Sequence, residues 1–450
     1  MESSHKYLAL VDMLERGIAE GRWRAGDRLP SNREMGAMFS VTVGTVSKAM
    51  AEAVRRGLVE ARVGSGTYVR AARRADPEPL ANGVVDLALN TLPTGVVEDV
   101  LDAALDRRGQ GGVAGALFSC SPSYDAARDR ALGARWLGRL GTPVAPEDVL
   151  LTTGVHQGLV AAFHALLKPG ARAVCEALTY TGTRRIAESR GVTLVGVAGD
   201  EHGLLPDAVD RALADTDARV LVVTTTLQNP TAASLTLERR EQLTAVCRSR
   251  DAHVIEDGVH IPLAGDELPS LAALMPERTI HLTGFSKCIA SGFRLGYASM
   301  PPAMRSAFHE ALTAAQWIGP GFFAELVATM YADGAVERCI ARHRAEAAHR
   351  QALVRSHFPG AHAGSSPCYH AWIEAPAGGS AHDLCLDAAN VGVKVSPGQH
   401  FAVDPAAPTP AGVRVSLGAC GRAELARALE KLAACWRRLQ GSPTTRAPLV

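Results

Sequence analysis

The feature that most constrains the fold of this chain is an alternation of short apolar runs with helical stretches, which starts near residue 86. The apolar runs are predicted to be strands, and they cover residues 149–153, 173–177, 193–198, 220–226, 253–257 and 279–283. Because strands joined by helical crossovers run parallel, the pattern predicts an α/β fold with a mostly parallel sheet and helices on both faces. A chain of 450 residues has room for about two to four folding units.

The rest of the chain divides into a head, a linker and a smaller lobe. Residues 71–85 are polar and contain Pro77 and Pro79, so we predict a linker between a head of residues 1–70 and a body of residues 86–450. Residues from roughly 305 onward show helical periodicity and contain one further predicted strand at 413–417. We therefore expect the body to end in a smaller α+β lobe over residues 305–450.

The first half of the head predicts two helices. Apolar residues recur at helical spacing in the first of them, at Tyr7, Leu8, Val11, Leu14 and Ile18. Ser31 and Glu34 fit an S-x-x-E capping box, which begins a second helix that ends near Phe39.

The second half of the head predicts a third helix and a hairpin. After a turn at residues 40–41, the helix covers residues 42–56 with an apolar stripe of Val46, Met50, Ala53 and Val54. Residues 58–63 and 67–69 then flank Gly64-Ser65-Gly66, which is typical of a hairpin with a glycine-rich tip. Two helices joined by a tight turn and followed by a hairpin indicate a winged helix-turn-helix.

The charge of the head is compatible with nucleic acid as its partner, although the same asymmetry could arise by chance. Residues 1–75 contain 13 Lys and Arg against 8 Asp and Glu, whereas the remaining residues contain 34 against 38. The third helix would enter the major groove of double-stranded DNA and the glycines would let the hairpin tip approach the backbone. A small helical dimerisation module is the alternative. The candidate DNA-binding residues are Arg33, Thr42, Thr45, Ser47, Lys48, Gly64, Ser65 and Gly66.

The head contains three segments in order, "GDRLPSNRE", "TVSKA" and "GSGTYV". In these segments its sequence resembles the DNA-binding domain of the GntR family of transcription regulators. The resemblance implies an operator as the DNA partner. The family commonly has Arg early in the recognition helix where this chain has Val43, which puts direct base reading there in doubt.

The distribution of cysteines and of apolar residues predicts the cellular compartment of the protein. The nine Cys are scattered singly without a C-x-x-C pair, which favours reduced thiols in a cytosol and gives no metal-ligand spacing. We find no apolar run near the roughly 18 residues of a membrane span and no apolar leader after Met1. We therefore predict a cytoplasmic protein without a metal site or a membrane segment.

Candidate ligand-binding residues follow the predicted strands of the body, where open α/β sheets bind ligands. Gly154 precedes a helix whose amides could cradle a phosphate, with Val155 and His156 as the first residues. Tyr180, Asn229, Asp257, Ser286 and Lys287 follow later strands, and Arg294 comes shortly after. Each taken alone has an ordinary structural explanation, such as a turn, a helix cap or a surface lysine. Their combination suits pyridoxal phosphate, which needs a lysine amine, an acid for its ring nitrogen and a phosphate cradle.

The order of these residues resembles fold type I aminotransferases, and with the head the whole chain resembles the MocR subfamily of GntR regulators. The resemblance implies a homodimer that binds pyridoxal phosphate as a Schiff base on Lys287 in "GFSKCIASGFRLGY". It also implies that Asp257 pairs with the ring nitrogen, Asn229 bonds the ring hydroxyl and Tyr180 stacks on the ring. The phosphate would be held by Val155, His156, Ser286 and Arg294, and Arg414 in "GVRVSL" would bind the carboxylate of an amino-acid effector.

Several positions depart from that pattern. The family usually has Tyr after the aspartate, where this chain has Val259 and His260, and we expect His260 to take that place. The usual Ser or Thr before the lysine is Gly284, and Thr283 would point the other way. A Tyr of the segment that reaches the partner's site is replaced near Phe118. We therefore expect cofactor binding with an altered effector pocket.

Three hypotheses for function stay open on the sequence. The first is a regulator that senses an amino acid, an amine or the cofactor itself. The second is an active aminotransferase with an appended DNA-binding head. The third is a degenerate scaffold that binds no cofactor.

Overall fold

The structure is a computed structural model of the chain. Strands and helices alternate in it from β4 (Val149–Thr152) onward, as predicted. It describes residues 2–19, 22–23, 26–55, 58–62, 66–69, 83–110, 124, 126–264, 268–317, 319–362, 364, 366–376, 379–405 and 410–440. The chain divides into two compact units, a head of Met1–Ala75 and a body of Asp76–Val450.

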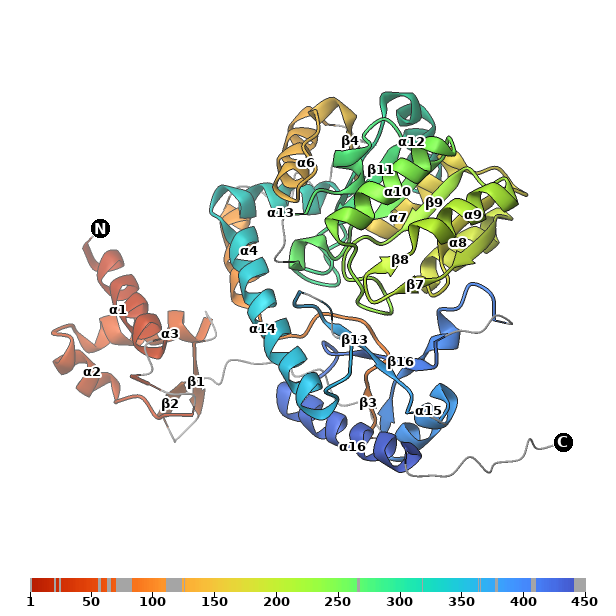
Figure 1. The fold of residues 1–450 in the computed structure, drawn as a ribbon. Helices are drawn as coiled ribbons and strands as arrows, with labels where there is room; N and C mark the ends of the chain where they lie inside the picture. Colours follow the sequence, from red (N-terminus) through yellow and green to blue (C-terminus); the bar gives the residue numbers. More distant parts are fainter. Residues whose placement is uncertain are drawn as a thin grey trace. The chain divides into compact units, whose positions relative to one another are not determined.

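The head contains three helices and a hairpin in the predicted order (Figure 1). These elements are α1 (Glu2–Ala19), α2 (Asn32–Met38), α3 (Val43–Arg55), β1 (Val59–Arg62) and β2 (Gly66–Val69). The hairpin is antiparallel and pairs Val59 with Val69. The capping box that begins α2 is present, because the Glu34 amide donates to the Ser31 hydroxyl and the Ser31 amide donates to the Glu34 carboxylate at 2.8 Å.

The core of the head follows the predicted apolar stripes with one exception. Leu14, Val46 and Ala53 are fully buried against Met35. Val54, which was predicted to belong to the stripe of the third helix, is 42% exposed. It follows Ala53 directly, so it lies a full 100° further around the helix and leaves the buried face.

The body is built around a seven-stranded sheet in the order β4-β12-β11-β10-β9-β5-β6 (Figure 1). Only β12 is antiparallel to its neighbours, and the other pairs are parallel. The strands are β4 (Val149–Thr152), β5 (Arg172–Glu176), β6 (Thr193–Val197), β9 (Val220–Val223), β10 (His253–Asp257), β11 (Thr279–Gly284) and β12 (Gly296–Ser299).

Helices cover both faces of this sheet because its strands are apolar on both sides. In β9, Val220 and Val222 belong to one hydrophobic core, while Leu221 and Val223 belong to another. The helices around the sheet are α4 (Glu98–Gln110), α6 (Ala127–Arg139), α7 (Val155–Leu166), α8 (Thr181–Arg190), α9 (Pro206–Thr216), α10 (Leu237–Ser249), α11 (Leu271–Leu274), α12 (Pro302–Ala315) and α13 (Gly321–Ala332). Short 3₁₀ turns cover Pro146–Asp148, Ile261–Leu263 and Gly398–His400, and a small hairpin pairs β7 (Gly199–Asp200) with β8 (Gly203–Leu204).

The smaller lobe has its own sheet and its own core. A three-stranded antiparallel sheet has the order β13-β16-β15, and a short strand β14 pairs in parallel with β3. The elements are β3 (Val85–Asp86), α14 (Ala335–His357), β13 (His370–Glu374), α15 (Ala381–Asn390), β14 (Val393–Lys394), β15 (Ser396–Pro397), β16 (Gly412–Ser416) and α16 (Arg422–Gln440).

The boundary of this lobe differs from the predicted residues 305–450. Phe308 and Leu312 of α12 and Val327 of α13 pack into the core of the large sheet, whereas Val354 of α14 packs into that of the lobe. Leu87, which follows β3, also packs into the core of the lobe. The body therefore starts at the smaller lobe and crosses to the large sheet, and α14 has residues in both cores. Among the described residues no helix is long and apolar enough to cross a membrane.

Candidate functional site

The polar residues that follow the strands of the large sheet meet around one cavity of about 480 Å³. Because the carboxyl ends of parallel strands share one edge of a sheet, residues far apart in sequence come together there. Tyr180 follows β5, Asn229 follows β9, Asp257 ends β10, and Ser286 and Lys287 follow β11. The cavity is also lined by predicted site residues from other elements, namely Val155, His156, His260, Arg294 and Arg414.

Lys287 is held at the cavity wall with its amine in a low-dielectric environment. Its Nζ atom donates a 2.6 Å hydrogen bond to the backbone carbonyl of Asn90. Burial, together with the nearby cations Arg414 and Arg294, lowers the pKa of Lys287 to about 8, although Asp257 opposes the shift. A lysine with such a pKa has a substantial neutral fraction near neutral pH, which is what a nucleophilic amine requires.

Asp257 is the buried acid of the same cavity. Its carboxylate accepts a 3.0 Å hydrogen bond from the amide of Val259 and is 7% exposed. Burial raises the pKa of Asp257 to about 6, while the Val259 bond and the charges of His281 and Lys287 hold it down. An acid placed in this way can form an ion pair with a cationic ring nitrogen.

Arg414 and Asn229 are bonded to each other. The Arg414 guanidinium donates from Nη1 to the Asn229 side-chain oxygen at 2.8 Å and from Nη2 to the carbonyl of Ala88. The guanidinium also lies over the ring of Phe401, 4.8 Å from its centroid. Arg414 is 6% exposed, so it presents a fixed and poorly solvated cation to the cavity.

The other end of the cavity is suited to an anion. Gly154 precedes α7 with a φ of +78°, and a Cβ atom there would come within 2.9 Å of the Arg294 guanidinium. Arg294 donates to the Ser286 hydroxyl at 3.4 Å and to the Thr153 carbonyl at 3.3 Å. The first amides of α7 and this cation therefore converge on one place, which is the arrangement that binds phosphate groups.

Tyr180 and His156 form an edge-to-face pair next to this anion site. Their ring centroids are 6.2 Å apart at an interplanar angle of 85°. Tyr180 is half-buried and precedes α8, whereas His156 is exposed. A flat ligand could use the Tyr180 ring as a stacking surface.

His260 is fully buried beside a second histidine that the sequence did not single out, His370. The two ring centroids are 5.1 Å apart, and burial holds the pKa of His260 well below its usual range. His370 bonds the carbonyl of Gln228 through Nε2 at 3.0 Å. The Nδ1 atoms of both rings are buried without a hydrogen-bond partner among the described residues.

The structure explains why position 284 is a glycine and not the Ser or Thr that is usual in the family. A Cβ atom there would meet the carbonyl oxygen of Leu295 at 2.9 Å, so no hydroxyl side chain fits. Thr283 is fully buried, and its hydroxyl bonds the carbonyl of Gly258 at 3.5 Å. Phe118 lies outside the described residues.

Several groups at the cavity were missed on the sequence. The backbone carbonyls of Ala88 and Asn90 bind Arg414 and Lys287, and carbonyls leave no mark on residue type. The hydroxyls of Thr91 and Ser291 form a 2.9 Å hydrogen bond at the cavity wall. The sequence offered one signal for this segment: the polar residues Asn90 and Thr91 precede Pro93, which could have indicated a loop at the binding site.

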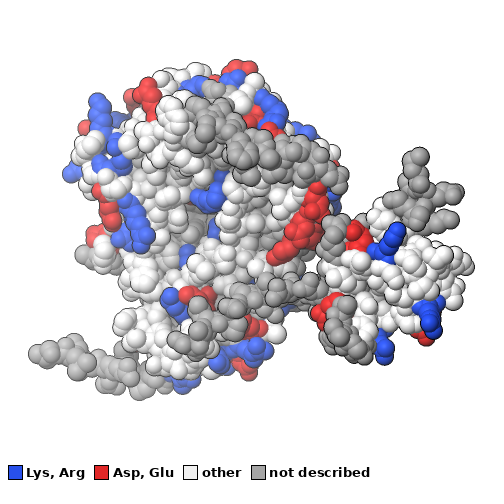
Figure 2. All heavy atoms as spheres, turned by 180° about the vertical axis from the view of Figure 1, so that it is seen from behind, with Lys and Arg blue, Asp and Glu red and all other residues white. Residues whose placement is uncertain are grey.

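The candidate DNA-binding residues of the head lie mostly on its surface. Arg33, Ser47 and Lys48 are exposed, and Thr45 is half-buried. Two hydroxyls are already used, because Thr42 caps α3 by accepting from the Thr45 amide and Ser47 accepts from Asn32 at 3.1 Å. Gly64 and Ser65 lie outside the described residues, and Gly66 begins β2 with a φ of +116°. On the face of the body in Figure 2, positive and negative side chains are interspersed rather than gathered in one basic patch.

Two family models match separate parts of the chain. Residues 82–432 match the family described as aminotransferase class I and II. Residues 6–69 match the family of bacterial regulatory proteins described as gntR.

Similar proteins include transcription regulators and an aminotransferase. The HTH-type transcriptional regulator TauR of Rhodobacter capsulatus is 29% identical over 95% of this chain and 96% of its own length. The HTH-type pyridoxine biosynthesis transcriptional regulator PdxR of Corynebacterium glutamicum is 30% identical over 77% of each chain. Among solved structures, LysN, the alpha-aminoadipate aminotransferase of Thermus thermophilus bound to N-(5'-phosphopyridoxyl)-L-leucine, has a TM-score of 0.70 and 27% identity, covering 80% of this chain and 93% of that chain.

Proposed function

The chain belongs to the aminotransferase class I and II family and, with its GntR head, is a transcription regulator of the MocR type that binds pyridoxal phosphate. From this premise we propose that the cofactor is bound to Lys287 and makes the protein a sensor of an amino acid or amine. The observation that carries the proposal is the meeting of Lys287, Asp257 and Arg414 around one cavity.

The residues of the cavity fit the cofactor at each of its polar groups. Asp257 is a buried acid whose only bond in the described part of the chain comes from a backbone amide, so it has room for a ring nitrogen. Asn229 and His260 would face the ring hydroxyl, and Tyr180 would stack on the ring. The phosphate would be held by the amides of Val155 and His156 with Ser286 and Arg294, at the glycine cradle of Gly154.

The chain's own residues would select and hold the effector. When bound, pyridoxal phosphate supplies an aldehyde that reacts reversibly with amines. Lys287 would hold the aldehyde, because its pKa of about 8 leaves a fraction of its amine neutral and nucleophilic near neutral pH. Arg414 offers a fixed guanidinium for a carboxylate, which would favour amino acids over simple amines.

The head would transmit this signal to an operator on double-stranded DNA. We propose that two copies form a homodimer whose heads bind two half-sites, with contacts from Arg33, Thr45 and Lys48 and from the hairpin tip at residues 64–66. Thr42 and Ser47 would contribute less, because their hydroxyls already have partners within the head. Since effector and operator are coupled in this scheme, each must change the affinity of the other by the same factor.

One experiment separates this function from its alternatives. The purified full chain is loaded with pyridoxal phosphate, reduced with borohydride, digested and mapped, and operator affinity is measured with an amino-acid and amine panel. We expect the label on Lys287 and an effector-dependent change in operator affinity. Sustained turnover that depends on a keto acid would support an aminotransferase instead. Absence of cofactor absorbance, even with added cofactor, would support a scaffold without it.

A further inference from the structure

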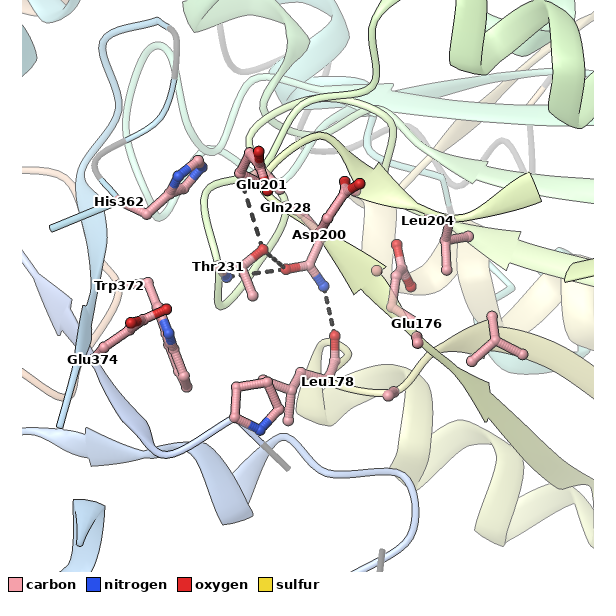
Figure 3. A pocket seen from close by; sticks show the side chains of 17 residues that line it. Glu176, Leu178, Asp200, Glu201, Leu204, Gln228, Thr231, His362, Trp372 and Glu374 are labelled. Carbon is pink, nitrogen blue, oxygen red and sulfur yellow. Dashed lines mark hydrogen bonds between the residues drawn. The ribbon is translucent and has the colours of Figure 1, made fainter. Parts of the chain in front are cut away.

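The body contains a second and larger cavity of about 630 Å³, separate from the one that holds Lys287. It lies between the large sheet and the smaller lobe (Figure 3). On one side it is lined by His362, Trp372 and Glu374 of the smaller lobe. On the other side it is lined by Glu176 at the end of β5 and by the β7–β8 hairpin, with Gln228 and Thr231 between them.

Charge distinguishes this cavity from that of the cofactor. Its described lining residues include four acids and neither Lys nor Arg, and the acids are Glu176, Asp200, Glu201 and Glu374. Arg239 neutralises Asp200 through a two-pronged ion pair whose shorter contact is 2.6 Å. Burial raises the pKa of Glu176 to about 7, and its carboxylate accepts hydrogen bonds from the Thr224 amide and the Thr179 hydroxyl. The free negative charge therefore comes from Glu201 and Glu374, which are exposed and form no ion pair in the described part of the chain, and it favours a cation. The cofactor cavity, with Lys287, Arg294 and Arg414, repels one.

Polar and aromatic groups that could bind ammonium line the same cavity. Trp372 is 4% exposed, and its indole ring can attract a cation through its face. His362 borders the same cavity, and burial lowers its pKa while a bond to the backbone of Ala232 opposes the shift, so the ring adds no positive charge that would oppose a cation.

The remaining lining is apolar, which argues against a bare metal ion. Leu178, Val197 and Leu204 contribute aliphatic surface, and a hydrated metal ion would leave it uncovered. The described residues also contain no group of three or more His, Cys, Asp or Glu arranged to hold a metal. A ligand whose positive charges are separated by methylene segments could contact both the acidic and the aliphatic lining residues.

The geometry points to a second ligand site in this cavity, between the sheet and the smaller lobe, that binds an aliphatic polyamine cation. Its ammonium groups face Glu374 and Glu201 and the ring of Trp372, and its methylene segments cover Leu178, Val197 and Leu204. A volume of this size is in the range of small-molecule sites, roughly 300–1,000 Å³. Gln228 and Thr231 line this cavity, whereas Asn229 of the same loop lines the cofactor cavity, so the two sites share a wall.

The test is calorimetric titration of the full chain with spermidine at fixed ionic strength and without DNA. We expect one site per chain, with an affinity that falls about tenfold or more in Glu374→Gln and in Trp372→Leu. Glu374 is exposed, so its variant keeps the test valid if the buried Trp372 variant fails to fold. The matched control is Glu430→Gln, an exposed carboxylate on α16 that should bind as the wild type does.

Two results would overturn the inference. One is the absence of saturable binding, and the other is equal affinity in Glu374→Gln, Glu430→Gln and the wild type, which would indicate diffuse attraction to surface charge. Lys287→Ala separates this site from the proposed function, because it should lose the covalent cofactor and still bind spermidine. Loss of spermidine binding in that variant would also count against a separate site.

Discussion

The Arg414 guanidinium donates a 2.8 Å hydrogen bond to the side-chain oxygen of Asn229, although the two residues are 185 positions apart in the chain. One of them would bind the effector's carboxylate and the other the ring hydroxyl of the cofactor. An effector that draws Arg414 toward its own carboxylate must therefore compete with Asn229, which connects recognition of the effector to the cofactor.

Arg414→Lys should remove the preference for a carboxylate. A lysine gives one point charge in place of a two-pronged guanidinium, so the affinity for amino acids should fall about tenfold or more. The affinity for the matching amines without a carboxylate should change little. Titration of the bound cofactor's absorbance measures both, with the exposed Arg427→Lys as the control. Equal losses for amino acids and amines would contradict the assigned role.

The attachment of pyridoxal phosphate should depend on pH through Lys287. The neutral amine is the reactive form, and a pKa of about 8 places its appearance near neutral pH. At pH 7 the neutral fraction is roughly 300-fold larger than for a lysine of ordinary pKa. The rate of attachment should rise from pH 6 to about 8 and then level off, as measured by stopped-flow absorbance.

Two controls accompany that pH profile. Lys287→Ala should show no covalent attachment at any pH, and Lys168→Ala, which removes an exposed lysine, should behave as the wild type. A rate that continues to rise beyond pH 10 would show that burial does not lower the pKa of Lys287.

The regular parts of this fold were predictable because they depend on local pattern. The strand 253–257 was predicted with the bounds that it has, and the other five predicted strands of the large sheet agree within a few residues. The seventh strand, β12 (Gly296–Ser299), was not predicted. The capping box of Ser31 and Glu34 was predictable for the same reason, because both partners lie within four residues.

The parts that escaped prediction depend on distant pairing or on backbone atoms. Strands β3 and β14 pair Val85 with Val393, and two-residue strands carry no periodicity. The partner of Lys287 is a carbonyl, which every residue type provides. His370 lies within a strand and differs from a core residue only through its contact with His260, which no spacing in the sequence reveals.

Arg33→Ala should weaken binding to the operator and leave the cofactor's absorbance unchanged. Arg33 is exposed on the first turn of α2, where it can reach a phosphate or a guanine edge. We expect a loss of about tenfold at fixed salt concentration. The exposed Arg427→Ala on the body removes the same charge and should have no such effect, as a gel-shift titration would show. An unchanged affinity in Arg33→Ala would mean that this part of the head does not contact DNA.

Gly154→Ala should weaken the binding of pyridoxal phosphate through the position of Arg294. Gly154 has a φ of +78°, and a methyl group there would come within 2.9 Å of the Arg294 guanidinium. Gly170 is a matched control, because its φ is +84° but nothing lies within 4 Å of an added Cβ atom. Both alanine variants should lose thermal stability through backbone strain. Only Gly154→Ala should also raise the dissociation constant of the cofactor, by about tenfold or more, since it displaces the cation of the phosphate site. If equilibrium dialysis gave the same constant for both variants, the anion site at the start of α7 would have to be placed elsewhere.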